Sequence, residues 1–202
     1  TVILILIQIG GLGIMTLSTL FAMILGRRLG LREEESMRGI LDQSSSAQMY
    51  KLIVQIVRIT LVFEFTGFAF LYLKWMPSMG SPEALRQSAF HAVSAFCNAG
   101  FSLNASNLVG YVHDPYVNVA IMFLIIFGGL GFVVIDNLVK NMKNLNPFSI
   151  RWSRLSVHTR LVLSTSTFLI IVGTLFVFFF EFDNTLLDLS IRDKLIASVF
   201  QS

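Results

Sequence analysis

Hydrophobic residues gather in four runs, each long enough to cross a membrane as a helix. A bilayer core about 30 Å thick needs about 20 apolar helical residues. The runs carry no charge except for Arg58 and Glu64, so they keep no solvated face. The sequence therefore predicts an all-α membrane protein rather than four buried helices of a soluble core. The runs are residues 1–25, 52–73, 116–135 and 161–180.

The composition excludes several other classes of protein. Of the 202 residues, 54% are hydrophobic and only 13% are charged, whereas a soluble domain has roughly 25% charged residues. These values argue against a soluble enzyme, a disordered chain and a nucleic-acid-binding module. A single cysteine, Cys97, rules out an internal disulfide. The chain opens on an apolar run without a basic region, so we expect a start within a longer protein rather than a signal peptide.

Lysine and arginine residues predict the orientation of the helices. Two of the connections between the runs are rich in them, and the other two segments outside the runs hold two each. Positively charged loops stay in the cytoplasm, so we expect the first helix to run inward and the second to return. The rich connections contain Arg27, Arg28, Arg32, Arg38 and Lys51 on one hand, and Lys140, Lys143, Arg151 and Arg154 on the other.

Residues 87–113 carry no Asp, Glu, Lys or Arg, yet they are too polar for a clean span. A helix start precedes them, with Ser81 as the N-cap, Pro82 at the first helical position and Glu83 in the first turn. Apolar positions continue to Phe96, and a glycine-containing segment follows. Two interpretations stay open: a re-entrant loop that dips into the membrane from outside, and an outer surface loop with an amphipathic helix.

Two motifs recur along the chain in the same order. Gly-Gly-Leu-Gly at 10–13 returns after 118 residues at 128–131, and Ser-Ala-Phe at 94–96 returns after 104 residues as Ser-Val-Phe at 198–200. Close packing of membrane helices explains small residues by themselves. The order of the motifs, however, predicts a repeated unit of a first helix (M1), a short outer helix with a loop (P) and a second helix (M2). The glycines expected to pack closely are Gly10, Gly11, Gly13, Gly128, Gly129 and Gly131.

The repeat divides the chain into five parts. Residues 1–26 are expected to be the last helix of one unit, and 52–139 a complete unit. Residues 158–202 are expected to hold the M1 helix and the start of the pore helix of a further unit, for which Ser190 and Asp193 give the start signal. Cytoplasmic linkers are expected at 27–51 and 140–157. Inside the complete unit we expect M1 at 52–73, a pore helix at 82–96, a filter at 97–102 and M2 at 116–138.

A re-entrant loop of this kind suits the passage of a cation. An ion that sheds its water needs replacement oxygens, and rings of backbone carbonyls supply them in potassium-selective filters. A glycine can aim successive carbonyls inward, and the carboxyl end of the pore helix favours a cation. Asn98, Ala99, Gly100 and Phe101 would present these carbonyls, and the Phe101 ring would pack outward and support the wall.

At this point the sequence resembles a known family. Residues 94–102, Ser-Ala-Phe-Cys-Asn-Ala-Gly-Phe-Ser, resemble the second filter of the Trk/Ktr/HKT potassium transporters, which typically reads S-A-F-N-N-A-G-F, with Cys97 in place of the usual Asn. Residues 7–15 resemble the last helix of the first repeat in the Ktr branch. Residues 158–163 resemble the opening of the third repeat, and residues 197–202 resemble the third pore helix, which leads into V-T-P-R-T-A-G-F in the family.

The resemblance implies a potassium-channel-like architecture of four M1-P-M2 repeats around one pore. It implies the ion-translocating subunit of a bacterial Ktr system in the cell membrane. Its partners would be the lipid bilayer, a second copy in a homodimer and a cytoplasmic nucleotide-binding regulatory ring of the KtrA type. No cofactor is expected in this chain, with nucleotide bound only by the regulatory subunit. The permeant ion would be potassium, with sodium as the alternative. One and a half repeats by themselves should not conduct.

A few other residues could carry different chemistry. Glu64 lies in the middle of a span, where a carboxylate is either functional or a structural partner behind the filter. Together with Cys97 and Ser102 it is expected to support the filter. A hydrolase based on Ser94 and His91 lacks an acid that would orient the histidine, and His113 with Asp114 makes a poor metal site. The function alternative is a non-conducting structural or assembly subunit of a transporter, and no enzymatic activity is expected.

Overall fold

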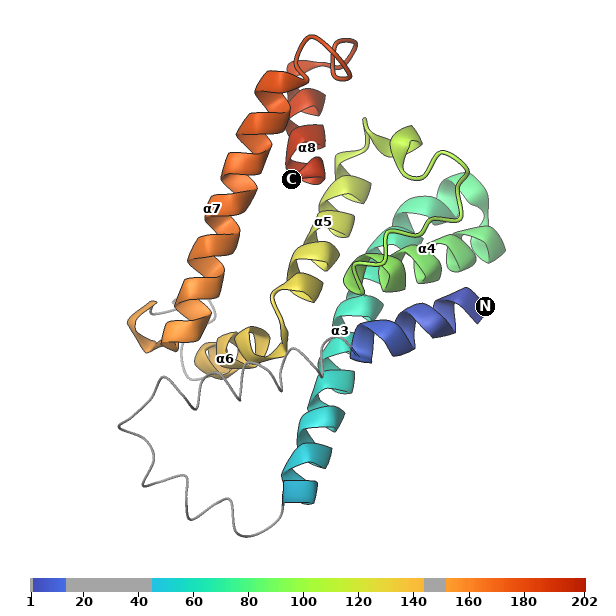
Figure 1. Ribbon diagram of the computed structural model, residues 1–202. Coiled ribbons are helices and arrows are strands. Elements are labelled where there is room, and N and C mark those ends of the chain that lie inside the picture. The colour runs from blue at the N-terminus through green and yellow to red at the C-terminus, as the bar shows by residue number, and fades with distance from the viewer. Residues whose placement is uncertain (1, 14–44, 144–151) are drawn as a thin grey trace.

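The computed structural model describes residues 2–13, 45–143 and 152–202, and for 45–52 and 142–143 only the backbone (Figure 1). The described residues form helices joined by turns and irregular segments, without a strand. The helices are an N-terminal helix (Val2–Gly13), α3 (Ser45–Met79), α4 (Ser81–Phe96), α5 (Pro115–Gly129), α6 (Phe132–Lys143), α7 (Val157–Phe180) and α8 (Ile191–Gln201). Two short 3₁₀ turns, η1 (Val109–Tyr111) and η2 (Trp152–Arg154), connect them.

Two of these helices are long and apolar enough to cross a membrane, α3 over Ile53–Met79 and α7 over Val157–Phe180. They contain the predicted runs at 52–73 and 161–180 and are longer than predicted; α3 reaches back into the expected linker at 27–51. The first predicted run, 1–25, is described only as the short helix Val2–Gly13, and the rest of it lies outside the described residues. The prediction of an all-helical membrane protein thus agrees with the structure.

The third predicted span differs from its expected form. We expected one continuous helix at 116–138, but α5 ends at Gly129 and α6 begins at Phe132, with a bend of 103° between them. Gly131 has a φ of +81°, in the left-handed region where a glycine ends a helix without strain. The pair makes a third span only if a broken helix is counted as one. The expectation of an unbroken helix is therefore wrong at Leu130–Gly131.

One face of α3 is buried against α4 and α5. The buried positions follow a spacing of three or four residues, as expected for one stripe of a helix, and are Ile56, Thr60, Glu64, Gly67, Leu71 and Trp75. The remaining faces carry exposed apolar side chains such as Phe65 and Phe70, which suit lipid. Gly67 permits close packing, since a methyl group there would lie 2.5 Å from Cδ1 of Leu124 in α5.

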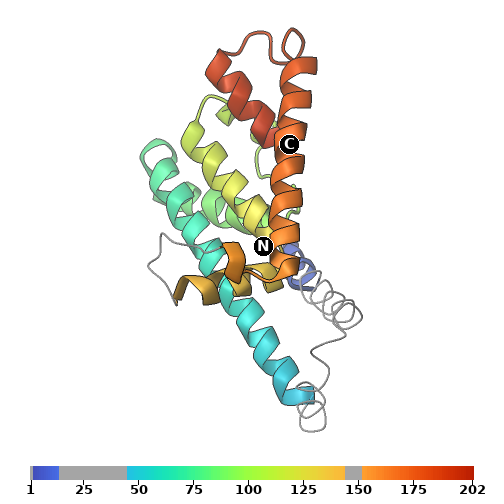
Figure 2. The same cartoon turned by 90° about the vertical axis from the view of Figure 1, so that its left-hand side faces the viewer.

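Helix α4 begins at the carboxyl end of α3 and runs back toward the middle of the molecule (Figures 1 and 2). Its N-cap is Gly80, with a φ of +78°, and not the predicted Ser81. The Ser81 hydroxyl is instead 2.8 Å from the Tyr72 hydroxyl of α3, because the left-handed glycine moves the helix start one residue earlier. The helix ends at Phe96, where the sequence predicts its end.

Helices α7 and α8 form a second pair of the same kind. Helix α8 lies beside the carboxyl-terminal half of α7 and runs antiparallel to it (Figure 1). As predicted, Ser190 is the N-cap of α8, and its side chain accepts the N–H of Asp193 at 3.2 Å. Helix α8 also contacts α5, so the two predicted units, 52–139 and 158–202, touch at this point.

Candidate functional site

The loop that follows α4 begins with a defined helix end. The N–H of Asn98 bonds to the carbonyl of Ala95 at 3.0 Å, and the N–H of Ala99 bonds to the carbonyl of Ser94 at 2.9 Å. Asn98 has a φ of +53°. These two bonds and one left-handed residue make a Schellman motif, in which asparagine is one of the few residues other than glycine that is well tolerated. The motif reverses the chain at Asn98, so that the next residues run back along α4.

Asn98 also ties this turn to helix α5. Its side-chain amide donates to the carbonyl of Ile125 at 3.3 Å and lies 3.5 Å from the carbonyl of Phe96. Helix α5 comes this close because Gly128 has no side chain: a methyl group there would overlap the Phe96 carbonyl oxygen and lie 2.8 Å from its carbon. The end of α4 therefore lies directly on the glycines of α5.

The six glycines expected to pack closely behave in two ways. A methyl group at Gly11 would overlap the sulfur of Cys97, and one at Gly129 would be 3.8 Å from the Asn98 amide nitrogen. A methyl group at Gly128 would overlap as well, so Gly11 and Gly128 pack closely, whereas the distance at Gly129 is an ordinary contact. At the other three a methyl group would meet no described atom within 4 Å, and Gly131 serves the helix break. The three are Gly10, Gly13 and Gly131.

Gly100 and Phe101 continue the turn. Gly100 has a φ of +72°, and a methyl group there would meet nothing within 4 Å, so its need for glycine is conformational rather than steric. The carbonyl of Phe101 accepts a hydrogen bond from the Ser94 hydroxyl at 2.7 Å. The Phe101 ring is 57% exposed among the described residues, and its support of the filter wall stays a prediction. With its carbonyl held toward α4, the ring lines an open cavity.

This cavity has a volume of about 1100 Å³ and lies between the two units. The loop contributes Asn98, Gly100 and Phe101 to its wall, and the following unit contributes residues of α7, α8 and their connection. The turn is thus on the surface of an open space rather than inside the packed core.

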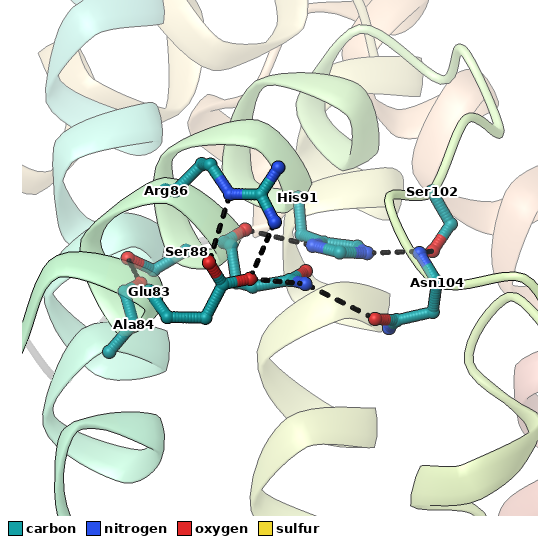
Figure 3. A network of polar contacts seen from close by, with 8 residues as sticks. Glu83, Ala84, Arg86, Ser88, His91, Ser102 and Asn104 are labelled. Atoms are coloured by element: carbon teal, nitrogen blue, oxygen red, sulfur yellow. Dashed lines mark hydrogen bonds and ion pairs between the residues drawn. The ribbon is translucent and has the colours of Figure 1, made fainter. Parts of the chain in front are cut away.

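Two more segments of the loop lie along α4 (Figure 3). Nε2 of His91 is 2.9 Å from the Ser102 hydroxyl, and the Gln87 amide donates to Oδ1 of Asn104 at 3.2 Å. In the part of the chain that the structure describes, His91 and Ser94 bond to the loop and not to each other, so they do not form a nucleophile and base pair. The sequence did not indicate that Gln87 and Asn104 bind each other, since an amide side chain in a sequence does not reveal its hydrogen-bond partner.

Glu64 and Cys97 meet behind the turn. Glu64 is only 7% exposed, and the Cys97 thiol lies 3.9 Å from its Oε1 atom. The side chain of Gln8, in the N-terminal helix, also hydrogen-bonds to Glu64. Cys97 is a free thiol that is partly buried. These contacts fit a structural carboxylate that joins two helices to the first residue of the loop.

The outer residues His113 and Asp114 make structural contacts. Asp114 accepts the N–H of Tyr116 at 3.1 Å as the N-cap of α5 and pairs with Lys74 at 2.9 Å. His113 bonds to Asp193 of the following unit at 2.8 Å, and this hydrogen bond, with a smaller one from Ser190, lowers the pKa of Asp193. Among the described residues no group of three His, Cys, Asp or Glu side chains could hold a metal ion.

The sequence matches the family of TrkH cation transport proteins over residues 1–199. The chain belongs to this family. It is therefore a membrane protein of a transport family, not of an enzyme family.

Several known proteins are similar to this chain. It is 41% identical to Ktr system potassium uptake protein B of Bacillus subtilis, over all of this chain and 44% of that protein. It is 37% identical to the Vibrio alginolyticus protein of the same name, over 98% of this chain and 42% of that protein. It is 30% identical to potassium/sodium uptake protein NtpJ of Enterococcus hirae, over 83% of this chain and 36% of that protein. The chain thus spans less than half the length of these relatives.

Proposed function

We propose that residues 52–139 form one repeat of a potassium-selective pore, in which the backbone carbonyls of Asn98, Ala99, Gly100 and Phe101 bind the ion. The protein moves potassium into the cell down its electrochemical gradient. Helix α4 is the pore helix, residues 97–102 are the filter of a re-entrant loop, and α3 and the α5–α6 pair are M1 and M2. Residues 1–26 and 158–202 belong to the repeats before and after, joined by linkers at 27–51 and 140–157.

The observation that carries this proposal is the backbone of the turn. Asn98 and Gly100 are both left-handed, at +53° and +72°, and one residue separates them. Left-handed residues at alternate positions point successive carbonyls in directions that a helix or a strand does not allow. Non-helical backbone at membrane depth is tolerated where it is buried in protein or lines a water-filled space, and the turn borders a cavity of about 1100 Å³.

The chemistry needs no charged side chain at the ion. Carbonyl oxygens replace the hydration shell, and the partial negative charge at the carboxyl end of α4 favours a cation next to the turn. Glu64 supports the start of the filter segment through the Cys97 thiol, and Ser102 supports its end through His91. Of the six glycines of the two M2 helices, Gly11 and Gly128 serve the packing and Gly131 the bend described above, and the close packing of Gly10, Gly13 and Gly129 stays a prediction.

The membrane, the partners and the second ion are proposed from the names of the relatives. Two of them are named as proteins of Ktr systems, so we place this protein in the bacterial cell membrane, as a homodimer on a cytoplasmic nucleotide-binding ring of the KtrA type. The name of a third relative includes sodium, so sodium is the second ion to be tested. The chain binds no nucleotide itself, and by itself it does not conduct.

The test uses the full-length protein that contains this sequence, expressed in cells deficient in potassium uptake. We expect potassium uptake from the wild type. Gly100→Ser should lose uptake or its preference for potassium over sodium, because serine disfavours a φ of +72°. Gly110→Ala is the control, since a methyl group there meets nothing within 4 Å and its φ is not left-handed. It should behave as the wild type.

Two results would contradict the proposal. Unchanged uptake and unchanged ion preference in Gly100→Ser would show that the loop is not the filter. A wild-type protein that reaches the membrane but adds no uptake above empty cells would favour a non-conducting structural subunit.

A further inference from the structure

Three side chains on one face of α4 hold the returning limb of the loop. Ser94, His91 and Gln87 are three and four residues apart, so they lie in one row along the helix. Their partners come in the opposite order along the chain: the Phe101 carbonyl at 2.7 Å, the Ser102 hydroxyl at 2.9 Å and the Asn104 amide oxygen at 3.2 Å. The limb therefore runs antiparallel to α4, fastened at three levels. We call these three contacts the ladder.

The middle contact of the ladder has a defined direction. Nδ1 of His91 lies 2.8 Å from the Gln87 carbonyl, which can only accept. In the neutral imidazole, Nδ1 thus carries the proton, and Nε2 accepts the hydrogen of the Ser102 hydroxyl. The Ser102 oxygen in turn accepts the N–H of Asn104 at 3.0 Å. His91 is 2% exposed and packs edge-on against the ring of Trp75, so its ring is fixed by packing as well.

In the contact between Gln87 and Asn104, donor and acceptor are fixed as well. The amide nitrogen of Gln87 donates both to Asn104 and, at 3.1 Å, to the carboxylate of Glu83. That carboxylate receives two hydrogen bonds from Arg86, at 3.0 and 2.7 Å (Figure 3). A carboxylate accepts only, so it sets which end of the Gln87 amide faces the loop. Helix α4 thus presents an acceptor at His91 and donors at Ser94 and Gln87, each matched to the loop.

From this geometry we infer that His91 and Gln87 are positioning residues that determine the selectivity of the pore for potassium over sodium. The inference rests on the proposed function. Neither side chain belongs to the filter segment itself. His91 holds Ser102 and Gln87 holds Asn104. Through this limb they act on the last carbonyl of the filter, that of Phe101, which the Ser94 hydroxyl binds directly.

The reason lies in the size difference between the two ions. A filter that discriminates by its carbonyl geometry or by the number of its ligands loses discrimination when the backbone can close around the smaller ion. Among the described residues the loop has few other fixed contacts on this side: no described atom lies within 4 Å of where a side chain of Gly100 would start, and Phe101 is exposed. Removing one contact of the ladder should therefore loosen the carbonyls before it unfolds the helix.

Another serine of α4 supplies the matched control. The hydroxyl of Ser88 is fully buried but bonds within the helix, to the carbonyl of Ala84 at 2.6 Å, and not to the loop (Figure 3). Ser88→Ala therefore removes a buried hydroxyl of the same helix and leaves the ladder intact. It separates the positioning of the loop from the general stability of α4.

The experiment measures the potassium-to-sodium permeability ratio of the full-length protein, together with its amount in the membrane. His91→Leu and Gln87→Met should each lower the ratio about tenfold, the scale expected for one buried hydrogen bond. His91→Gln should restore most of it, because its amide oxygen can accept from Ser102 near the position of Nε2. Ser88→Ala should keep the wild-type ratio.

A double-mutant cycle tests the contact itself. If His91 acts through Ser102, the effects of His91→Leu and Ser102→Ala on the ratio should be non-additive. An unchanged ratio in both His91→Leu and Gln87→Met, additive effects in the cycle, or an equal fall in Ser88→Ala would each overturn the inference. If His91→Leu fails to reach the membrane, Gln87→Met and Ser102→Ala decide. A wild type without potassium flux would instead refute the proposed function, and the inference with it.

Discussion

The contact between Gly128 and the end of α4 gives the sharpest steric prediction. In Gly128→Ala the new methyl group would overlap the carbonyl oxygen of Phe96 and lie 2.8 Å from the carbonyl carbon and 3.1 Å from the Asn98 amide nitrogen. Real contacts of this kind rarely fall below 3.0 Å, and two of the three atoms belong to backbone that cannot rotate away. Helix α5 and the turn at Asn98 must therefore move apart.

The expected magnitude follows from two opposing effects. Overpacking of a well-packed site costs about 1–3 kcal/mol, whereas alanine in a helix is more stable than glycine by about 0.5–1 kcal/mol. The net effect of Gly128→Ala is a destabilisation of about 1–2 kcal/mol. The displaced atoms belong to Phe96 and Asn98, next to the proposed filter. Gly128→Ala should therefore lose a larger fraction of its potassium uptake than of its stability.

The assay compares thermal unfolding of the detergent-solubilised full-length protein with potassium uptake in cells. Gly129→Ala is the matched control, because its methyl group would be 3.8 Å from the Asn98 amide nitrogen, an ordinary contact. We expect the midpoint of unfolding to fall by a few degrees in Gly128→Ala and to stay near the wild type in Gly129→Ala. Equal stability and equal uptake in the two variants would refute the packing of α5 on α4.

Two further predictions concern the turn and the contact between the units. In Asn98→Gly the backbone can stay left-handed but the amide bond to Ile125 is lost, and in Asn98→Ala both are lost. The midpoint of thermal unfolding should therefore be highest in the wild type, lower in Asn98→Gly and lowest in Asn98→Ala. A reversed order of the two variants would contradict the turn. The hydrogen bond from His113 lowers the pKa of Asp193, so this bond stabilises the fold above the ordinary aspartate value of about 3.9 and is lost as the pH falls through the lowered native value. The stability difference between the wild type and Asp193→Asn should be largest near neutral pH and vanish in acid, and a difference independent of pH would argue against it.

The hydrophobic pattern was sufficient for the elements that depend on local sequence. The long apolar helices α3 and α7 follow from uncharged runs, and the Ser190 cap follows from a local signal. The start of α4 was misplaced by one residue because Ser81 is a good cap in general, whereas the choice of Gly80 depends on a left-handed turn after α3. The break at Gly131 was not predicted for a similar reason, since a glycine in an apolar run does not reveal whether its φ is positive.

The site was predictable only in part. The identity of the loop came from a motif, and its chemistry from the absence of charged residues, but neither reveals which contacts hold it. His91 and Ser94 drew attention as a potential catalytic pair because of their spacing, and the same spacing instead places both on the face that binds the loop. Gln87 and Asn104 are 17 residues apart, and only the reversal of the chain at Asn98 brings them together.

The paired glycines of the two predicted M2 helices take part both in the sequence repeat and in helix packing. The offset of 118 residues pairs Gly10 with Gly128 and Gly11 with Gly129. Gly128 lies against the end of α4, whereas Gly11, from the N-terminal helix, lies against Cys97 at the start of the loop that follows α4. Their counterparts in the predicted repeat differ, since a methyl group at Gly10 would meet no described atom within 4 Å and one at Gly129 would make an ordinary contact at 3.8 Å. The loop after α4 is therefore packed against two helices at once, because a side chain at Gly11 or at Gly128 would separate one of these helices from it.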